Sequence, residues 1–275
     1  MPGAFDASFT ASAGYVIRSM VGGIDSFPLL AVPMFVLAGI LMAHGKISEK
    51  LFDVFVYFLG NKRAGIPCAV IITCLFYGAI SGSAPATVAA VGSMTIPLLI
   101  ELGYEKDFST AIVAVAGGLG VIIPPSIPFI MYAMATGESV SDLFLAGIVP
   151  GMMISALLIF YAYYYCRRHG EDREKIQAKM DQLKTKGFVN ILKESIWALL
   201  SPVIVLGCIY SGVASPTEAA VISVFYSLFV SLFIYKSIKV KQIWGIMVEA
   251  MKTYAPILFI PVSYTHLRAH ETGAY

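Results

Sequence analysis

Long stretches without a charged residue constrain this chain more than any other feature. A helix needs about 20 residues to cross a hydrocarbon core about 30 Å thick. Six charge-free runs approach or exceed that length: Ser26–His44, Ala64–Ile100, Phe108–Gly137, Leu143–Cys166, Ser195–Thr217 and Ala219–Tyr235. Only 13% of the residues are charged. The runs are continuously apolar and do not alternate as the strands of a barrel would. We therefore predict an all-α integral membrane protein, with spans at 26–44 and 143–166.

The positions of the basic residues predict the orientation. Eight of them lie between Arg167 and Lys193, and an excess of Lys and Arg is typical of cytoplasmic loops. We therefore interpret 167–194 as a cytoplasmic loop, which leaves 138–142 and 211–216 outside. The loop alternates in sign and has few aromatic residues, which favours a solvated connector over a nucleic-acid site.

The run 64–100 is interrupted at its centre by Gly-Ala-Ile-Ser-Gly-Ser-Ala-Pro-Ala-Thr, residues 78–87. The run is too long for one span and marginal for two, so we predict a re-entrant hairpin. Irregular backbone at membrane depth is tolerated only where protein or a water-lined cavity satisfies its polar groups. A half-helix should begin near Pro85, with Ser83 as a capping residue.

A second broken element follows at 108–137, where glycines 117, 118 and 120 precede Pro124-Pro125-Ser126-Ile127-Pro128. A double proline removes backbone donors and should split this helix in two. The hairpin and the discontinuous helix are therefore expected to meet at a protected polar pocket.

Where two half-helices meet, the unpaired N–H groups at the N-terminus of one favour an anion, and the unpaired carbonyls at the C-terminus of the other favour a cation. Because neither broken element contains Asp, Glu, His, Lys or Arg, the side chains on which proton-coupled transport would rely, we favour sodium coupling. No other metal, cofactor or enzymatic activity is expected. Close helix packing and a simple proline kink are the alternative interpretations of the same residues. The candidate sodium- and substrate-binding residues are Ser81, Gly82, Ser83, Ala84, Pro85 and Thr87 in the hairpin, and Gly117, Gly118, Gly120, Pro124, Pro125, Ser126 and Pro128 in the discontinuous helix.

The remaining segments suggest an inverted repeat. Residues 46–61 are predicted to form an interfacial amphipathic helix, with Leu51, Val54, Phe55 and Phe58 on its apolar face. Lys239–Lys252 looks like a second such segment. A Pro-x4-Pro spacing recurs at 28–33 and 256–261, in opposite predicted directions, as in many secondary transporters.

These patterns divide the chain into four parts. Residues 1–166 form a first repeat with a partial N-terminus, 167–194 the cytoplasmic loop, and 195–262 the start of a second repeat. Residues 263–275 are polar and basic and resemble an adapter-derived ending, so we exclude this tail and interpret the chain as a fragment.

Four ordered motifs, at 78–92, 123–128, 143–151 and 215–220, resemble the large permease subunit of TRAP (tripartite ATP-independent periplasmic) transporters. The resemblance covers roughly residues 14–262. It implies a multi-pass protein of the bacterial inner membrane with an elevator-type, inverted-repeat fold, powered by a sodium gradient. It also implies a small four-helix membrane subunit, a periplasmic solute-binding protein and an organic-acid substrate such as a C4-dicarboxylate or sugar acid.

The chain departs from that family at both ends, because most of the first two spans and the second hairpin are missing. The fragment alone is therefore not expected to transport. Two alternatives remain open at this point: a dicarboxylate or gluconate carrier of the same superfamily that needs no binding protein, and a non-transporting membrane scaffold.

Overall fold

A computed structural model describes residues 27–185 and 187–272, and every regular element in this part of the chain is helical. The α-helices are α2 (Ala31–His44), α3 (Ile47–Leu59), α4 (Gly65–Ser81), α5 (Ala84–Glu101), α6 (Lys106–Gly117), α7 (Ile127–Thr136), α8 (Val140–His169), α9 (Arg173–Thr185), α10 (Phe188–Tyr210), α11 (Pro216–Phe229) and α12 (Val240–Thr272). Shorter turns are η2 (Phe27–Leu30), η3 (Gly118–Val121) and the π-helix η4 (Val230–Ile234). The predicted all-α class is confirmed.

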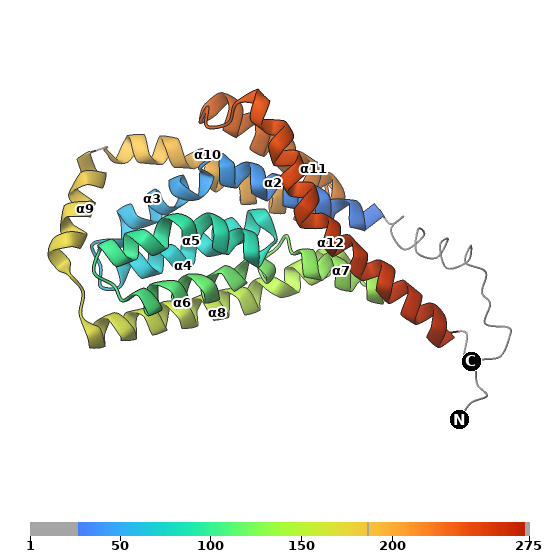
Figure 1. Cartoon of the computed structure of the whole chain (residues 1–275), viewed down its shortest axis with the longest axis horizontal. Coiled ribbons are helices and arrows are strands. Elements are labelled where there is room, and N and C mark those ends of the chain that lie inside the picture. Colours follow the sequence, from blue (N-terminus) through green and yellow to red (C-terminus); the bar gives the residue numbers. More distant parts are fainter. Residues whose placement is uncertain (1–26, 186, 273–275) are drawn as a thin grey trace.

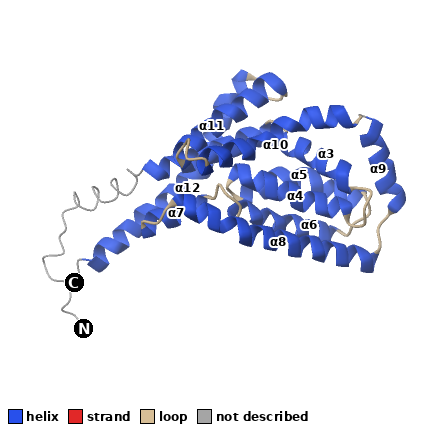
Figure 2. Cartoon of the chain, turned by 180° about the vertical axis from the view of Figure 1, so that it is seen from behind, coloured by secondary structure: helices blue, strands red, loops and turns tan. Residues whose placement is uncertain are grey.

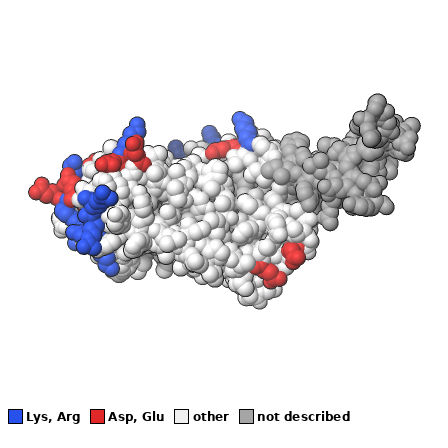
Figure 3. Space-filling model, turned by 90° about the horizontal axis from the view of Figure 1, so that it is seen from below, with Lys and Arg blue, Asp and Glu red and all other residues white. Residues whose placement is uncertain are grey.

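Five helical segments in the described part are long and apolar enough to cross a membrane: Phe27–His44, Ala84–Glu101, Val140–His169, Val189–Tyr210 and Pro216–Ile234. In the space-filling view, charged residues gather towards the ends and one edge of the molecule, and a wide uncharged zone lies between them (Figure 3). This distribution is the one that a hydrocarbon core requires, because a charge placed there would lose its hydration.

The hairpin of α4 and α5 stops short of the far end of the molecule. The thirty residues of α8 extend about 45 Å at 1.5 Å per residue, whereas the seventeen of α4 extend only about 25 Å. The start of α4 and the end of α8 lie at the same end of the molecule, where the Ala64 N–H donates to Glu171. The turn between α4 and α5 lies beside the middle of α8 (Figure 1). The chain therefore reverses direction about halfway along the length of α8.

The discontinuous helix consists of α6, the short η3 turn, an irregular segment and α7. Helix α6 lies beside the hairpin, and α7 continues past the hairpin tip towards the far end (Figure 1). The break contains both Pro124 and Pro125, as proline chemistry predicts. The two interrupted elements thus lie at the same depth.

Several predicted boundaries need correction. The loop 167–194 is largely helical: α9 buries Ile176, Met180 and Leu183, and α10 begins at Phe188 instead of near Ser195. The few apolar residues of this segment recur at helical spacing, so they share one face of α9, and that face packs against the rest of the protein.

The amphipathic segments also differ in part from prediction. Helix α3 buries Leu51 and Val54, but Phe58 is 57% exposed, so it does not belong to the buried face. Lys239–Lys252 does not form a separate element, because α12 runs without a break from Val240 to Thr272, through the boundary expected at 262. Helices α2 and α12 run in roughly opposite directions (Figure 1), and the view from behind shows no strand among the described residues (Figure 2). The partial N-terminus expected at 1–26 and the last three residues of the tail lie outside the described residues.

A buried carboxylate joins three loops at the end of the molecule that carries the basic residues. Glu171 accepts hydrogen bonds from the Tyr104 hydroxyl at 2.7 Å and the Ala64 N–H at 3.0 Å, and pairs with Arg173 at 3.2 Å. Burial and the hydrogen bond to Glu171 raise the pKa of the Tyr104 phenol well above its usual value. This cluster ties the ends of α4, α5 and α8 together.

Candidate functional site

The hairpin tip is a sharp turn of only two residues. Helix α4 ends at Gly82, whose backbone is left-handed with φ +61° and whose N–H donates to the Gly78 carbonyl at 2.9 Å. Glycine takes this conformation without the steric cost that a Cβ would add. Ser83 is extended, and α5 starts at the next residue with Pro85 in its first turn. The negative end of α4 and the positive end of α5 therefore lie within two residues of each other.

Hydroxyl and carbonyl oxygens converge inside this turn. The Ser83 carbonyl accepts from the Thr87 N–H at 3.0 Å, from the Thr87 hydroxyl at 2.9 Å and from the Ser81 hydroxyl at 3.3 Å. The Ser81 and Thr87 hydroxyls are 3.0 Å apart. Ser81 is 1% exposed and Thr87 is fully buried. Three oxygens thus form a compact, uncharged cluster, the type of donor set that a hard cation such as sodium prefers.

The break in the discontinuous helix has its own polar centre at Ser126. Its hydroxyl donates to the Val121 carbonyl at 2.6 Å and accepts from the Phe129 N–H at 3.4 Å, so it caps the start of α7. The side chain is fully buried. The hydroxyl therefore satisfies backbone groups that the proline break leaves unpaired.

The two broken elements touch through backbone. The Ile127 N–H donates to the Gly82 carbonyl at 3.3 Å. A Cβ added to Gly78 would lie 2.5 Å from the Gly120 Cα, and one added to Gly120 would lie 2.5 Å from the Thr87 hydroxyl. Only glycine permits this approach, so the spacing of small residues in both elements is explained by their contact.

The predicted site residues divide by their exposure. Eight of them are buried at or next to the contact: Ser81, Gly82, Thr87, Gly117, Gly120, Pro124, Pro125 and Ser126. Three are half-buried, namely Ser83, Ala84 and Gly118, and two are exposed, namely Pro85 and Pro128. Ser83 does stand at the N-cap position, but its side chain makes no capping hydrogen bond. Its contribution to the cluster is its carbonyl oxygen.

The sequence did not single out Gly39 of α2 or Tyr77 of α4, which hold the hairpin tip against α2. A Cβ on Gly39 would lie 3.0 Å from the Ser81 Cα, and the buried Tyr77 hydroxyl donates to the Gly39 carbonyl at 2.9 Å. A glycine within an otherwise bulky apolar run was the available signal. Nothing in its spacing, however, indicates a partner so far along the chain.

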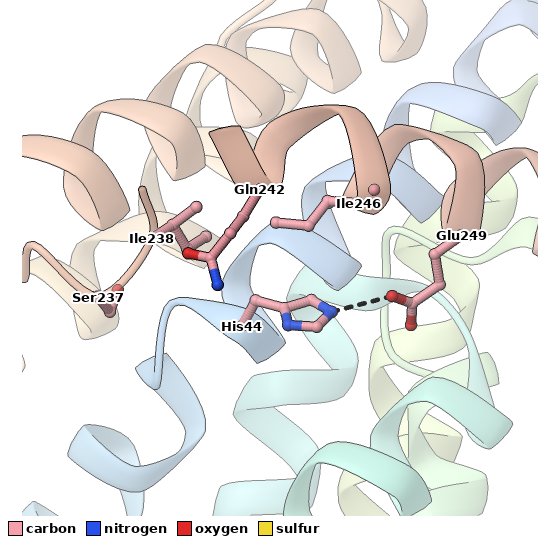
Figure 4. Close-up of a pocket in the computed structure, with 7 residues that line it drawn as sticks. His44, Ser237, Ile238, Gln242, Ile246 and Glu249 are labelled. Carbon is pink, nitrogen blue, oxygen red and sulfur yellow. Dashed lines mark hydrogen bonds and ion pairs between the residues drawn. The ribbon is translucent and has the colours of Figure 1, made fainter. Parts of the chain in front are cut away.

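A cleft opens on the other side of the hairpin, against α2, α3 and α12. One part of it, of about 310 Å³, has Ala86, Ala89, Ala90 and Ser93 of α5 on one wall and Gly39, His44 and Glu249 on the other. A neighbouring part, of about 380 Å³, lies between His44 and the start of α12. The His44 Nε2 and a Glu249 carboxylate oxygen are 2.9 Å apart across it (Figure 4). This hydrogen bond joins α2 to α12.

Comparison with known proteins gives a consistent result. Residues 5–265 match the profile of the family described as "Tripartite ATP-independent periplasmic transporter, DctM component". The chain is 43% identical to the isethionate TRAP transporter permease protein DctMQ of Oleidesulfovibrio alaskensis, over 90% of this chain and 38% of that protein. It is 34% identical to the C4-dicarboxylate TRAP transporter large permease protein DctM of Rhodobacter capsulatus, over 93% of this chain and 61% of the relative.

A third relative is the 2,3-diketo-L-gulonate TRAP transporter large permease protein YiaN of Escherichia coli, 36% identical over 90% of this chain and 56% of its own length. The chain therefore spans between 38% and 61% of the length of these curated relatives. The names of the relatives differ in the solute that they specify.

Proposed function

We propose a transport function for this chain, which belongs to the DctM component family of tripartite ATP-independent periplasmic transporters. The chain is a multi-pass protein of the inner membrane. In the complete protein, these residues would form part of the large permease subunit of a secondary transporter that imports organic acids. They would not catalyse a chemical reaction.

The contact between the hairpin tip and the discontinuous helix is the observation that supports this proposal best. Two membrane elements are broken at the same depth, and their breaks face each other through glycine backbone. Close packing alone would be met by continuous helices with small residues. Breaking both helices exposes polar termini to each other, which is useful where a solute or ion must be bound away from bulk water.

In this proposal sodium binds as the coupling ion at the oxygen cluster of Ser81, Ser83 and Thr87. The hydroxyls now hydrogen-bond within the turn, and a small rotation of either would redirect its lone pairs to a cation. Since no described residue of the turn is charged, the cation would be held by dipoles and by the negative end of α4.

The organic acid would pass along the cleft beside α5. Its wall begins at Ala86, next to the buried Thr87, and continues along the helix to Met94. Small side chains leave room there for a solute a few carbons long. Selection among solutes would begin with a periplasmic solute-binding protein, and a small four-helix membrane subunit would complete the permease. An elevator movement of the hairpin against α2 and α12 would carry the solute across.

The test is sodium-dependent uptake by the complete permease, reconstituted with its partner subunits in proteoliposomes. Thr87→Val keeps the shape of the side chain but removes the hydroxyl. Ser83→Ala removes a hydroxyl that is not part of the oxygen cluster and leaves the Ser83 carbonyl in place. We expect Thr87→Val to raise the sodium concentration for half-maximal uptake by about tenfold, the loss of one strong oxygen contact. Ser83→Ala should have a smaller effect, because the carbonyl remains.

Thr110→Val is the matched control, because Thr110 is exposed on α6 and bonds only to its own helix at Lys106. An unchanged sodium requirement in Thr87→Val would contradict the sodium site. If, in addition, sodium gave the complete protein no protection against heat, the scaffold interpretation would be preferred.

A further inference from the structure

The loop after α8 contacts both ends of the short linker that joins α3 to the hairpin. This linker consists of residues 60–64, between the end of α3 and the start of α4. Helix α9 crosses the same end of the molecule, from the end of α8 towards the start of α10 (Figure 1). Glu171 and Arg173 thereby reach the linker, although 107 and 112 positions separate them from the residues to which they bond.

The linker contains a strained residue where it enters the hairpin. Ala64 is left-handed, with φ +57°, and it is the N-cap of α4. A residue with a Cβ rarely adopts this backbone conformation, because the Cβ comes too close to the following carbonyl oxygen. Such a conformation persists only where surrounding groups hold it in place. The side chain of Ala64 forms no capping hydrogen bond, so the support must come from elsewhere.

The carboxylate of Glu171 gives that support. One of its oxygens accepts hydrogen bonds from the Ala64 N–H at 3.0 Å and from the Tyr104 hydroxyl at 2.7 Å. The Glu171 side chain is only 2% exposed, and hydrogen bonds shielded from water are electrostatically stronger than exposed ones. Its negative charge also suits the N-terminal end of α4. Glu171 therefore holds Ala64 in its left-handed conformation.

Arg173 holds the other end of the linker. Its Nη2 pairs with a Glu171 oxygen at 3.2 Å, and its Nη1 donates to the Asn61 carbonyl at 3.2 Å. A planar guanidinium can make both contacts at once, whereas the single ammonium of a lysine lacks this forked geometry. The start of the linker also packs against α9, since a Cβ on Gly60 would lie 2.3 Å from the Met180 sulfur. Two residues in contact with each other thus hold Asn61 and Ala64.

We propose that Glu171 and Arg173, which we call the linker clamp, are positioning residues for transport. The clamp holds the linker in its strained conformation and so fixes the angle at which the hairpin leaves α3. This inference rests on the proposed function. The seventeen residues of α4 place the hairpin tip about 25 Å from the clamp, so the clamp does not touch the candidate ion site. Without the clamp, Ala64 would relax and α4 would tilt by itself, away from its contact with the discontinuous helix.

The first experiment measures hydrogen exchange of the complete permease in detergent, by mass spectrometry of peptides that cover residues 60–66. Asn61, Lys62 and Arg63 are exposed, and exposed loops with few contacts normally exchange quickly. We expect slow exchange at Ala64 because its N–H is bonded to Glu171. Arg173→Gln should speed this exchange by about tenfold, the loss of one charge-assisted contact. Arg173→Lys, which keeps the charge but loses the fork, should fall between the two.

Lys175→Gln is the matched control for the exchange experiment. Lys175 is an exposed cation on the same helix and pairs at 3.3 Å with Asp172, three residues away. Because an exposed pair of this kind contributes little, this variant should leave exchange of the linker unchanged.

The second experiment measures uptake by the permease reconstituted with its partner subunits, with isethionate, succinate and 2,3-diketo-L-gulonate as probes. Arg173→Gln should lower the maximal rate by about tenfold. The sodium and solute concentrations for half-maximal uptake should stay the same, because the tip is unaltered. Adding Ala64→Gly to Arg173→Gln should restore much of the rate, since glycine adopts a left-handed backbone without steric cost. A general loss of stability would not be repaired in this way.

Fast exchange at Ala64 in the unaltered protein would overturn the proposal, and this measurement does not depend on the folding of any variant. Unchanged exchange in Arg173→Gln, a higher solute concentration for half-maximal uptake in place of a lower rate, or failure of Ala64→Gly to restore the rate would also overturn it. If the unaltered permease takes up none of the probes, the proposed function fails and the role of the clamp in transport fails with it. The exchange data would still decide whether the clamp holds the linker.

Discussion

The contact between Gly78 and Gly120 makes a sharp prediction for Gly78→Ala. The new Cβ would lie 2.5 Å from the Gly120 Cα and 2.9 Å from its backbone N. Carbon atoms in favourable contact are about 3.5–4.0 Å apart, so the hairpin and η3 would have to separate by roughly 1 Å. No flexible side chain can move aside, because both clashing atoms belong to backbone.

The expected magnitude follows from two opposed effects. Overpacking of a tight contact costs about 1–3 kcal/mol, and a backbone clash belongs to the upper part of that range. Replacing glycine by alanine also stabilises the helix by up to about 1 kcal/mol, because alanine has the higher helix propensity. A net loss of about 2 kcal/mol remains, which lowers the midpoint of thermal unfolding by roughly 4–8 °C for a chain of this size.

Gly118→Ala provides the matched control. A Cβ on Gly118 has nothing within 4 Å, and its backbone is already right-handed with φ −60°. This variant should be neutral or slightly stabilised. Thermal unfolding of the two variants in the same detergent, followed by intrinsic fluorescence, makes the comparison. If Gly78→Ala unfolds at the same temperature as Gly118→Ala, the proposed backbone contact between the two broken elements is wrong.

Three further predictions concern other parts of the fold. Ser126→Ala removes the N-cap of α7 and should cost about 1 kcal/mol in chemical unfolding; full stability would mean that the hydroxyl is not needed at the break. Because the pKa of Tyr104 is raised in the folded state, its neutral form contributes stability below about pH 10, and this contribution declines as the pH rises further. Tyr104→Phe should therefore flatten the alkaline fall in unfolding temperature between about pH 10 and about pH 12, and it also removes the hydrogen bond to Glu171. Glu249→Gln should cost less than about 1 kcal/mol, since its partner His44 and Glu249 itself are both about half exposed; a larger loss would indicate that the cleft is closed to solvent.

The hairpin break was predictable because its cause is local. Glycine and proline at the centre of a charge-free run act on the backbone of their own segment, so the turn at Gly82 and the start of α5 beside Pro85 follow from the sequence. The role of Ser83 was only partly predictable. Its position just before α5 was foreseen, but its side chain makes no capping hydrogen bond. The partners of its carbonyl depend on how Thr87 folds back on the turn.

The structure of residues 167–194, which we predicted to be a cytoplasmic loop, was harder to foresee for a different reason. Its charges alternate, which indicated a solvated loop, but helix α9 also carries Ile176, Met180 and Leu183 on one side. Whether three apolar residues suffice to hold a helix depends on the surface that receives them, and that surface is supplied by distant parts of the chain.

The sequence by itself determined the membrane class, the approximate spans and the two points at which helices break. These follow from the thickness of the hydrocarbon core and from backbone chemistry, which act on each segment separately. Only the tertiary structure decided that Gly78 meets Gly120, that Gly39 supports Ser81 and that His44 pairs with Glu249. Each of these contacts joins residues far apart along the chain, and its geometry depends on the packing of whole helices, which no local pattern encodes.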